Sequence, residues 1–233
     1  MKNKFWNWVK CEENGSRTLY FDGYIAQDSW LDDAITPQKF KNELNSGTGD
    51  ISVWLNSPGG DAFSASRIYT MLKEYPGKVT VKIDGLAASA ASVVAMAGDE
   101  IYMAPSACMM IHNPATGIFG EASDLASGIK MLNEVKEGII NAYEARTGLP
   151  RTKISNMMDS ETWFSAQKAV ELGFADKILY TPEQTERAEG FIFDRVTITN
   201  ALRQKLPSTR QEKNTLPPGT SHAELTTRLN LLK

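Results

Sequence analysis

One serine, Ser89, stands among small residues in the segment IDGLAASAASVVAMAG, between a strand-like and a helix-like apolar run. A serine nucleophile on a sharp strand-to-helix turn needs small neighbours, because the turn must close and a substrate must reach the hydroxyl. The small neighbours here are Gly85, Ala87, Ala88, Ala90 and Ala91. The segment is therefore a candidate nucleophile turn, and close helix packing is the alternative that alanine and serine runs also indicate.

A serine nucleophile requires a general base, and the sequence contains two histidines. His112 ends the apolar run ACMMIH and is followed by Asn113 and Pro114, so we expect it at a strand end that enters a loop. Catalytic side chains are often carried at such positions. His222 lies in a polar C-terminal tail and is predicted to be a solvated surface residue. His112 is thus the candidate base, with a structural role as its alternative.

A carboxylate that holds the imidazole would complete a triad. The segment NMMDSETWFSA offers Asp159 and Glu161, and its apolar side chains are expected to desolvate both acids in part. The alternative is a pair of solvated loop acids.

The segment NSPGGDAFSASRIY places a Pro-Gly-Gly turn between a predicted strand and a predicted helix. Adjacent glycines allow positive φ and let a ligand approach bare N–H groups near a helix N-terminus. The turn can therefore bind an oxyanion, or it is an ordinary tight turn. It has neither the Walker spacing nor the dinucleotide glycine pattern, which excludes a phosphate loop.

The elements that must position these residues alternate between strands and helices. The β-branched segments 51–56 and 78–84 are predicted strands. Between them, Ile68, Met71 and Leu72 have the spacing of one buried helical face, which indicates a βαβ unit.

Two further strands are predicted at 100–105 and 108–112, followed by a long helix over 121–147 with an apolar side. Gly148 is expected to end that helix. The remaining elements are a short helix from Pro150 to Met158, a helix that begins after Ser165 and ends at Gly173, and a last strand over 174–180. This order predicts an α/β domain.

Composition excludes several classes of function. The chain has 233 residues, with 28 acidic and 25 basic residues that form no basic stripe, so we expect no nucleic-acid partner. Cys11 and Cys108 form neither a disulfide framework nor a metal cluster, and are interpreted as free thiols. No run approaches 18 apolar residues and no secretion signal is recognisable, so we predict a cytoplasmic protein without a membrane partner.

We divide the chain into an N-terminal segment at 1–16, a compact domain at 17–180 and a polar, proline-bearing extension at 181–233. The extension is predicted to end in a short helix, since Ser221 and Glu224 have capping-box spacing.

Four segments together resemble a known family. They are NSPGGDAFSASRIYTML, IDGLAASAASVVAMAGD, MMIHNPATGIFGEASDL and ETWFSAQKAVELGFADKI, in family order. The chain resembles the ClpP-type serine peptidases over residues 17–180, and most closely the ClpP-related head maturation (prohead) proteases of tailed phages and prophages. The resemblance implies an α/β fold of the ClpP/crotonase type, a spiral of repeated ββα units with a handle helix. It also implies a homo-oligomeric ring, a peptide or protein substrate and no cofactor or metal.

The resemblance further implies a role for each candidate residue. Ser89 would be the nucleophile and His112 the general base and then acid. The amides of Gly60 and Ala90 would form the oxyanion hole, while Gly59 and Asp61 would belong to the substrate-binding turn. The ungapped match places Glu161 at the triad acid, where ClpP itself has aspartate, and Asp159 is the alternative.

The expected function is a serine endopeptidase, ATP-independent or ATPase-assisted, that processes phage capsid or scaffold proteins during head maturation. One alternative is a crotonase-like acyl-CoA enzyme, which shares the fold and the oxyanion hole but needs neither Ser89 nor His112. The other is a catalytically silent ring or scaffold subunit.

Overall fold

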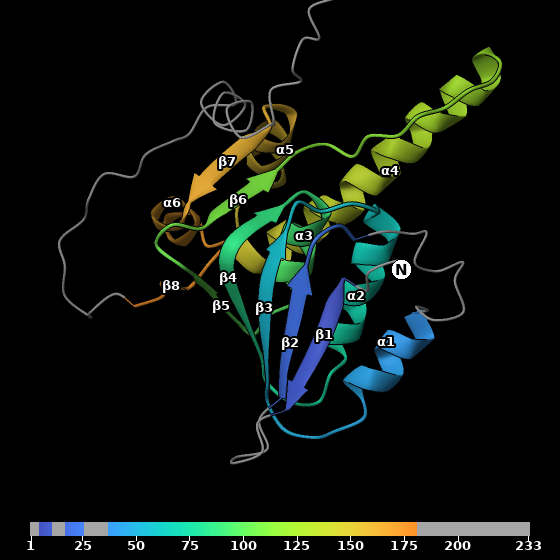
Figure 1. Ribbon diagram of the computed structural model, residues 1–233. Helices are drawn as coiled ribbons and strands as arrows, with labels where there is room; N and C mark the ends of the chain where they lie inside the picture. The colour runs from blue at the N-terminus through green and yellow to red at the C-terminus, as the bar shows by residue number, and fades with distance from the viewer. Residues whose placement is uncertain (1–4, 11–16, 26–36, 181–233) are drawn as a thin grey trace, which may run out of the picture. The chain divides into compact units, whose positions relative to one another are not determined.

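The computed structural model of the chain describes residues 5–10, 17–25 and 37–180 (Figure 1). The predictions for Cys11, for His222 and for the extension at 181–233 lie outside the described residues. The chain divides into two compact units, Met1–Asp194 and Arg195–Lys233, and the described residues all belong to the first.

The first unit is built on a sheet whose main path follows β1-β2-β3-β4-β5-β8. Strand β1 pairs antiparallel with β2, and the other neighbours on this path are parallel. The strands are β1 (Trp6–Lys10), β2 (Arg17–Asp22), β3 (Ile51–Ser57), β4 (Val79–Ala88), β5 (Glu100–Met103) and β8 (Lys177–Ile178). The segment predicted as N-terminal thus contains a strand of this sheet.

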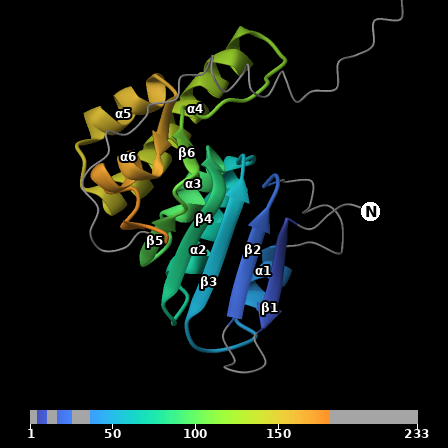
Figure 2. The same cartoon turned by 60° about the vertical axis from the view of Figure 1, so that its left-hand side comes forward.

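Six helices accompany the strands in the described residues. They are α1 (Pro37–Leu44), α2 (Ala62–Lys73), α3 (Ala90–Ala95), α4 (Ala122–Thr147), α5 (Arg151–Asp159) and α6 (Ala166–Glu171). Helices α1 and α2 lie on one face of the β1–β4 portion of the sheet (Figure 2). Helix α4 is the long helix expected from the sequence, and it ends at Gly148, whose φ of 65° is left-handed.

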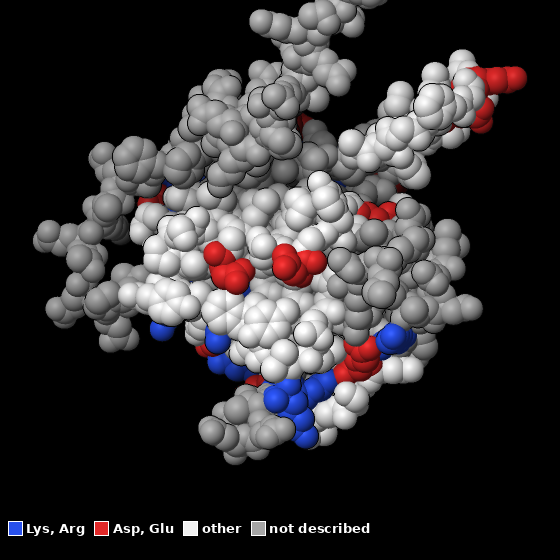
Figure 3. Space-filling model, in the orientation of Figure 1, with Lys and Arg blue, Asp and Glu red and all other residues white. Residues whose placement is uncertain are grey.

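The β2–β4 strands alternate between buried and accessible side chains. Phe21, Val53 and Leu55 face the helices and are at most 2% exposed, whereas Tyr20 on the opposite face is 43% exposed. Parallel strands are usually covered on both faces. Within the described part of the chain, no helix covers this second face, which Figure 3 shows as largely uncharged with acidic groups near its middle.

A branch of the sheet, formed by β6 (Cys108–Ile111) and β7 (Thr162–Ser165), positions Ser89 and His112. Strand β4 pairs with β3 from Val79 to Ala87, with β5 through its first half, and with β6 through Leu86–Ala88. Strand β6 also pairs antiparallel with β7. The sequence did not predict β7, and the strand expected over 174–180 is only Lys177–Ile178. The carboxyl ends of β4 and β6 therefore lie side by side, because the two strands are parallel.

Candidate active site

Ser89 occupies the turn between β4 and α3 and has an unusual backbone. Its φ of 55° and ψ of −126° are sparsely populated for a residue with a side chain, a conformation that costs about 1–3 kcal/mol. Both neighbours are small and buried: Ala88 is 2% and Ala90 5% exposed. The Ser89 N–H donates to the carbonyl oxygen of Met110 at 2.9 Å. The turn is therefore held against strand β6.

His112 directly follows β6 and meets Ser89. Its Nε2 lies 2.7 Å from the Ser89 Oγ, within hydrogen-bonding distance. Parallel pairing of β4 with β6, which ends at Ala88 and Met110, places the two side chains at adjacent strand ends. The structure thus brings together the two residues that the sequence singled out as nucleophile and base.

The Pro-Gly-Gly turn lies against the Ser89 turn. A Cβ added to Gly59 would be 2.6 Å from the Ala88 carbonyl oxygen, 2.8 Å from the Ser89 Cβ and 2.9 Å from the Ala90 nitrogen. Such distances do not occur, and the φ of Gly59, 96°, also disfavours a side chain. Only glycine fits at this position, and the Ala90 N–H lies beside it.

Gly60 is fixed by the neighbouring chain. Ile25 forms a parallel bridge with Gly60, in which its N–H donates to Gly59 and its carbonyl oxygen accepts from Asp61. Because the bridge uses groups on either side of Gly60, the Gly60 N–H points away from Ile25. Asp61 is the N-cap of α2, and its carboxylate accepts hydrogen bonds from the N–H and the hydroxyl of Ser64. The carboxylate is therefore engaged in starting the helix.

The two candidate acids have different surroundings. Asp159 ends α5, and its side chain is 51% exposed. It accepts hydrogen bonds from Lys136 at 2.6 Å and from Asn113 at 2.8 Å, and these bonds lower its pKa. Partial desolvation acts in the opposite direction and raises the pKa, but the hydrogen bonds outweigh it, so the pKa is lowered overall. This carboxylate holds the residue next to His112 and not the imidazole.

Glu161 directly precedes β7, next to the last residue pair that β7 forms with β6. The last β6–β7 pair is Ile111 with Thr162, so the next residues outward on the two strands are His112 and Glu161. Glu161 has a φ of 47° and accepts a hydrogen bond from the Trp163 indole at 3.4 Å. The antiparallel pairing thus makes His112 and Glu161 the residues that adjoin the same end of the β6–β7 ladder.

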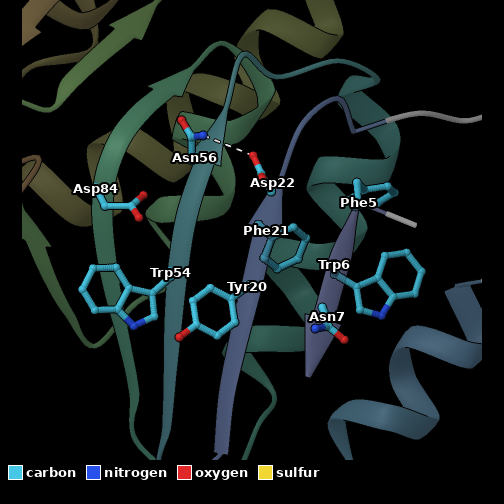
Figure 4. Close-up of a pocket in the computed structure, with 9 residues that line it drawn as sticks. All are labelled: Phe5, Trp6, Asn7, Tyr20, Phe21, Asp22, Trp54, Asn56 and Asp84. Atoms are coloured by element: carbon cyan, nitrogen blue, oxygen red, sulfur yellow. Dashed lines mark hydrogen bonds between the residues drawn. The ribbon is translucent and has the colours of Figure 1, made fainter. Parts of the chain in front are cut away.

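A concave surface elsewhere on the molecule is distinct from these residues. A cavity of about 360 Å³ lies on the accessible sheet face and includes Tyr20, Trp54, Asp22 and Asp84 among its lining residues (Figure 4). Asn56 donates a hydrogen bond to Asp22 there at 3.1 Å. Neither Ser89 nor His112 lines this cavity.

The described residues contain neither a membrane-spanning helix nor a metal-binding cluster. None of the described helices is long and apolar enough to cross a membrane. In the same residues, no group of three or more histidine, cysteine or acidic side chains could hold a metal ion.

Comparison with known proteins identifies the family to which the sequence is similar. The Clp protease family model matches residues 18–182. ATP-dependent Clp protease proteolytic subunit 2 of Thermobifida fusca is 36% identical over 139 residues, which are 58% of this chain and 68% of the relative. Proteolytic subunit 1 of Chlamydia muridarum is 35% identical over 170 residues, or 71% of this chain and 88% of the relative.

The chain therefore belongs to the Clp protease family, whose members are serine peptidases of mixed α/β fold. The family prediction made from the four sequence segments is confirmed at this level. Sequence reasoning gave no role to Ser92, whose hydroxyl donates to the Ser89 carbonyl oxygen, or to Tyr143, which is hydrogen-bonded to Ser92. Ser92 lies in a run of small residues that indicates close packing, and Tyr143 lies in a helix whose apolar pattern indicates burial, so neither pattern signals a hydrogen bond.

Proposed function

We propose that the protein is a serine endopeptidase that uses Ser89 as nucleophile and His112 as general base. The observation that carries this proposal is the 2.7 Å contact between the Ser89 Oγ and the His112 Nε2 at a positive-φ turn. A hydroxyl within this distance of an imidazole can transfer its proton as it attacks a peptide carbonyl. A strained turn also presents the hydroxyl outward from the end of β4.

The mechanism follows from the groups around the hydroxyl. His112 takes the Ser89 proton through Nε2 and returns it to the leaving amine, which gives an acyl-enzyme that water hydrolyses. The N–H groups of Gly60 and Ala90 stabilise the oxyanion of each tetrahedral intermediate, and loss of one such donor typically costs about 10²–10³ in kcat. Gly59 lets the two amides come close, since any side chain there would displace Ala90.

The triad acid in this proposal is Glu161. The strand register supports this choice, because Glu161 and His112 both adjoin the last β6–β7 pair, whereas Asp159 is bound to Lys136 and Asn113. A carboxylate at the Nδ1 side of the ring holds the tautomer in which Nε2 accepts the serine proton, and stabilises the imidazolium that forms.

We further propose that the active species is a homo-oligomeric ring. Helix α4 is 26 residues long, about 39 Å at 1.5 Å per residue, and its N-terminal half projects from the sheet (Figure 1). Leu125 and Ile129 on this half are 48% and 62% exposed, and Phe119 just before it is fully exposed. Exposed apolar residues gathered on one element are typical of a subunit interface.

Light scattering on the purified chain tests the assembly. We expect a homo-oligomer at micromolar concentration, and the double variant Leu125→Glu and Leu132→Glu should dissociate it. A wild-type monomer would refute the ring.

The substrate proposed is a phage capsid or scaffold protein cut during head maturation. The support is the resemblance of the four segments to prohead proteases and the extension beyond residue 180. The relatives described above are named as subunits of ATP-dependent proteases, so an ATPase partner is the competing arrangement. Portal and major capsid genes beside this gene, and cleavage of that capsid protein without ATP, would support the phage assignment.

A fluorophosphonate probe tests the chemistry. Wild-type protein should be labelled and should hydrolyse peptides, and Ser89→Ala should do neither while keeping its fold and assembly. His112→Ala should be comparably inactive, with His222→Ala as the matched control near wild type. An unlabelled wild-type protein would favour a silent subunit, and acyl-CoA turnover without peptide cleavage would favour a crotonase-like enzyme.

A further inference from the structure

Two buried hydroxyls lie beneath the Ser89 turn. Ser92 on α3 is 0% exposed and Tyr143 in the C-terminal half of α4 is 1% exposed. The Ser92 Oγ is 2.5 Å from the Ser89 carbonyl oxygen and 2.8 Å from the Tyr143 Oη. A chain of hydrogen bonds thus connects helix α4 with the backbone of the proposed nucleophile.

The direction of these bonds follows from the number of hydrogens. A carbonyl oxygen can only accept, so the single hydroxyl hydrogen of Ser92 is donated to Ser89. Tyr143 must then donate to Ser92. Burial raises the pKa of Tyr143 well above its ordinary value, so its hydroxyl keeps the proton that it donates. The Ser92 N–H donates to the same carbonyl at 3.0 Å.

The orientation of this carbonyl also sets the orientation of the next amide. In a planar trans peptide, the C=O and the following N–H point in opposite directions. Ser92 draws the Ser89 carbonyl toward the buried side, and the Ala90 N–H therefore points to the opposite side, where Gly59 lies against it. The other side of the turn is fixed by the Ser89 N–H bond to Met110.

We infer that Ser92, supported by Tyr143, is a positioning residue that aims the Ala90 N–H at the oxyanion. This inference rests on the proposed serine peptidase function and deepens it. Neither hydroxyl touches the substrate. They act on catalysis only by orienting the peptide plane between Ser89 and Ala90. They should therefore stabilise the transition state, where the oxyanion forms, without changing substrate binding.

Three variants of the full chain test this role: Ser92→Ala, Tyr143→Phe and the double variant. The measurements are kcat and KM on a peptide substrate, the rate of fluorophosphonate labelling and the melting temperature. We expect Ser92→Ala to lower kcat and the labelling rate about tenfold or more with KM nearly unchanged, less than full loss of an oxyanion donor. Tyr143→Phe should lower kcat less, because the Ser92 hydroxyl still donates to Ser89.

The double variant separates positioning from stability. Ser92→Ala leaves the Tyr143 hydroxyl buried without its acceptor, and removing that hydroxyl as well should restore much of the melting temperature. We expect kcat to stay low in the double variant. Recovery of kcat together with the melting temperature would overturn the inference and leave the pair a purely structural role.

Leu44→Ala in α1 is the matched control for destabilisation, since Leu44 is 1% exposed and belongs to a helix on the β1–β4 part of the sheet. It should lower the melting temperature and leave kcat near wild type at temperatures where the protein is folded. If the probe labels wild type and Ser92→Ala at the same rate, the positioning role is overturned but the proposed function is not. An unlabelled wild-type protein would overturn the proposed function, and this inference with it.

Discussion

The nucleophile end and the acid end of the proposed triad are held in different ways. Ser89 lies between buried alanines, and its N–H and carbonyl are both hydrogen-bonded to neighbouring elements. Asp159 and Glu161 lie at the accessible end of α5 and β7, and the ion pair of Asp159 with Lys136 is largely exposed on the aspartate side. The turn is fixed by packed backbone, whereas the acids depend on strand register and surface contacts.

This difference indicates where substitutions will do most damage. A backbone conformation enforced by close packing has no room to relax, so a single methyl group is costly there. A side chain at the accessible edge of two strands can shift and water can replace its partners. We therefore expect changes near Ser89 to act on the geometry of the oxyanion hole, and changes at the acids to act on charge.

The largest effect beyond the triad itself is expected from Gly59→Ala. The new Cβ would be within 3 Å of the Ala88 oxygen, the Ser89 Cβ and the Ala90 nitrogen. The Ala90 amide would be displaced, and kcat should fall by at least the 10²–10³ typical of a lost oxyanion donor. Peptide hydrolysis by the folded variant, checked by circular dichroism, gives the measurement.

Gly49→Ala is the control for Gly59→Ala. Gly49 has a similar φ, 88°, but no atom lies within 4 Å of an added Cβ. This variant should share the backbone strain without the collision, and so lose some stability while keeping kcat. Equal loss of activity in both variants would mean that strain, and not contact with the Ser89 turn, explains the need for glycine.

Within the proposed triad, a still larger effect is expected from Glu161→Gln. The amide keeps the shape of the side chain but removes the charge that would stabilise the His112 imidazolium. By analogy with amide replacement of a triad acid, kcat should fall by about 10⁴. Single-turnover rates of acylation should fall in parallel. A nearly silent Glu161→Gln would instead exclude this residue as the acid and contradict the register argument.

Much of the nucleophile end could be predicted from the sequence, because its requirements are local. The small residues around Ser89 form one short stretch of the chain, and the glycine pair forms another. The alternation of strands and helices predicted an α/β domain, although it did not predict which strands pair. His112 was recognisable since it ends an apolar run. These features need no knowledge of side-chain contacts.

The acid end could not be predicted in the same way. Strand β7 is only four residues long, Thr162–Ser165, and its antiparallel pairing with β6 depends on contacts between residues more than 50 positions apart. The apolar neighbours of Asp159 along the chain suggested burial, yet Met158 turns inward and Asp159 outward at the end of α5. The Ser92–Tyr143 bond likewise joins positions that no local pattern relates.

The smallest effect is expected from Asp159→Asn. Its carboxylate binds Lys136 and Asn113, and the lowered pKa means that the ionised form is favoured by folding. A depressed pKa stabilises the folded protein above the unfolded pKa, and that contribution is lost as the pH falls through the folded value. The variant should therefore melt slightly below wild type at neutral pH and equally at a pH below the lowered pKa. Activity should fall only a few-fold. Asn113, next to His112, would lose its hydrogen bond to the Asp159 carboxylate, whereas Glu161, the proposed partner of the imidazole, would be unchanged.

Melting curves across pH and salt, together with kcat, measure this difference, and added salt should reduce it since the Asp159 side of the pair is about half exposed. Lys136→Met provides the matched control, because it removes the same ion pair from the other side and leaves Asp159 on Asn113. If Asp159→Asn is the crippling variant while Glu161→Gln is nearly silent, Asp159 is the triad acid.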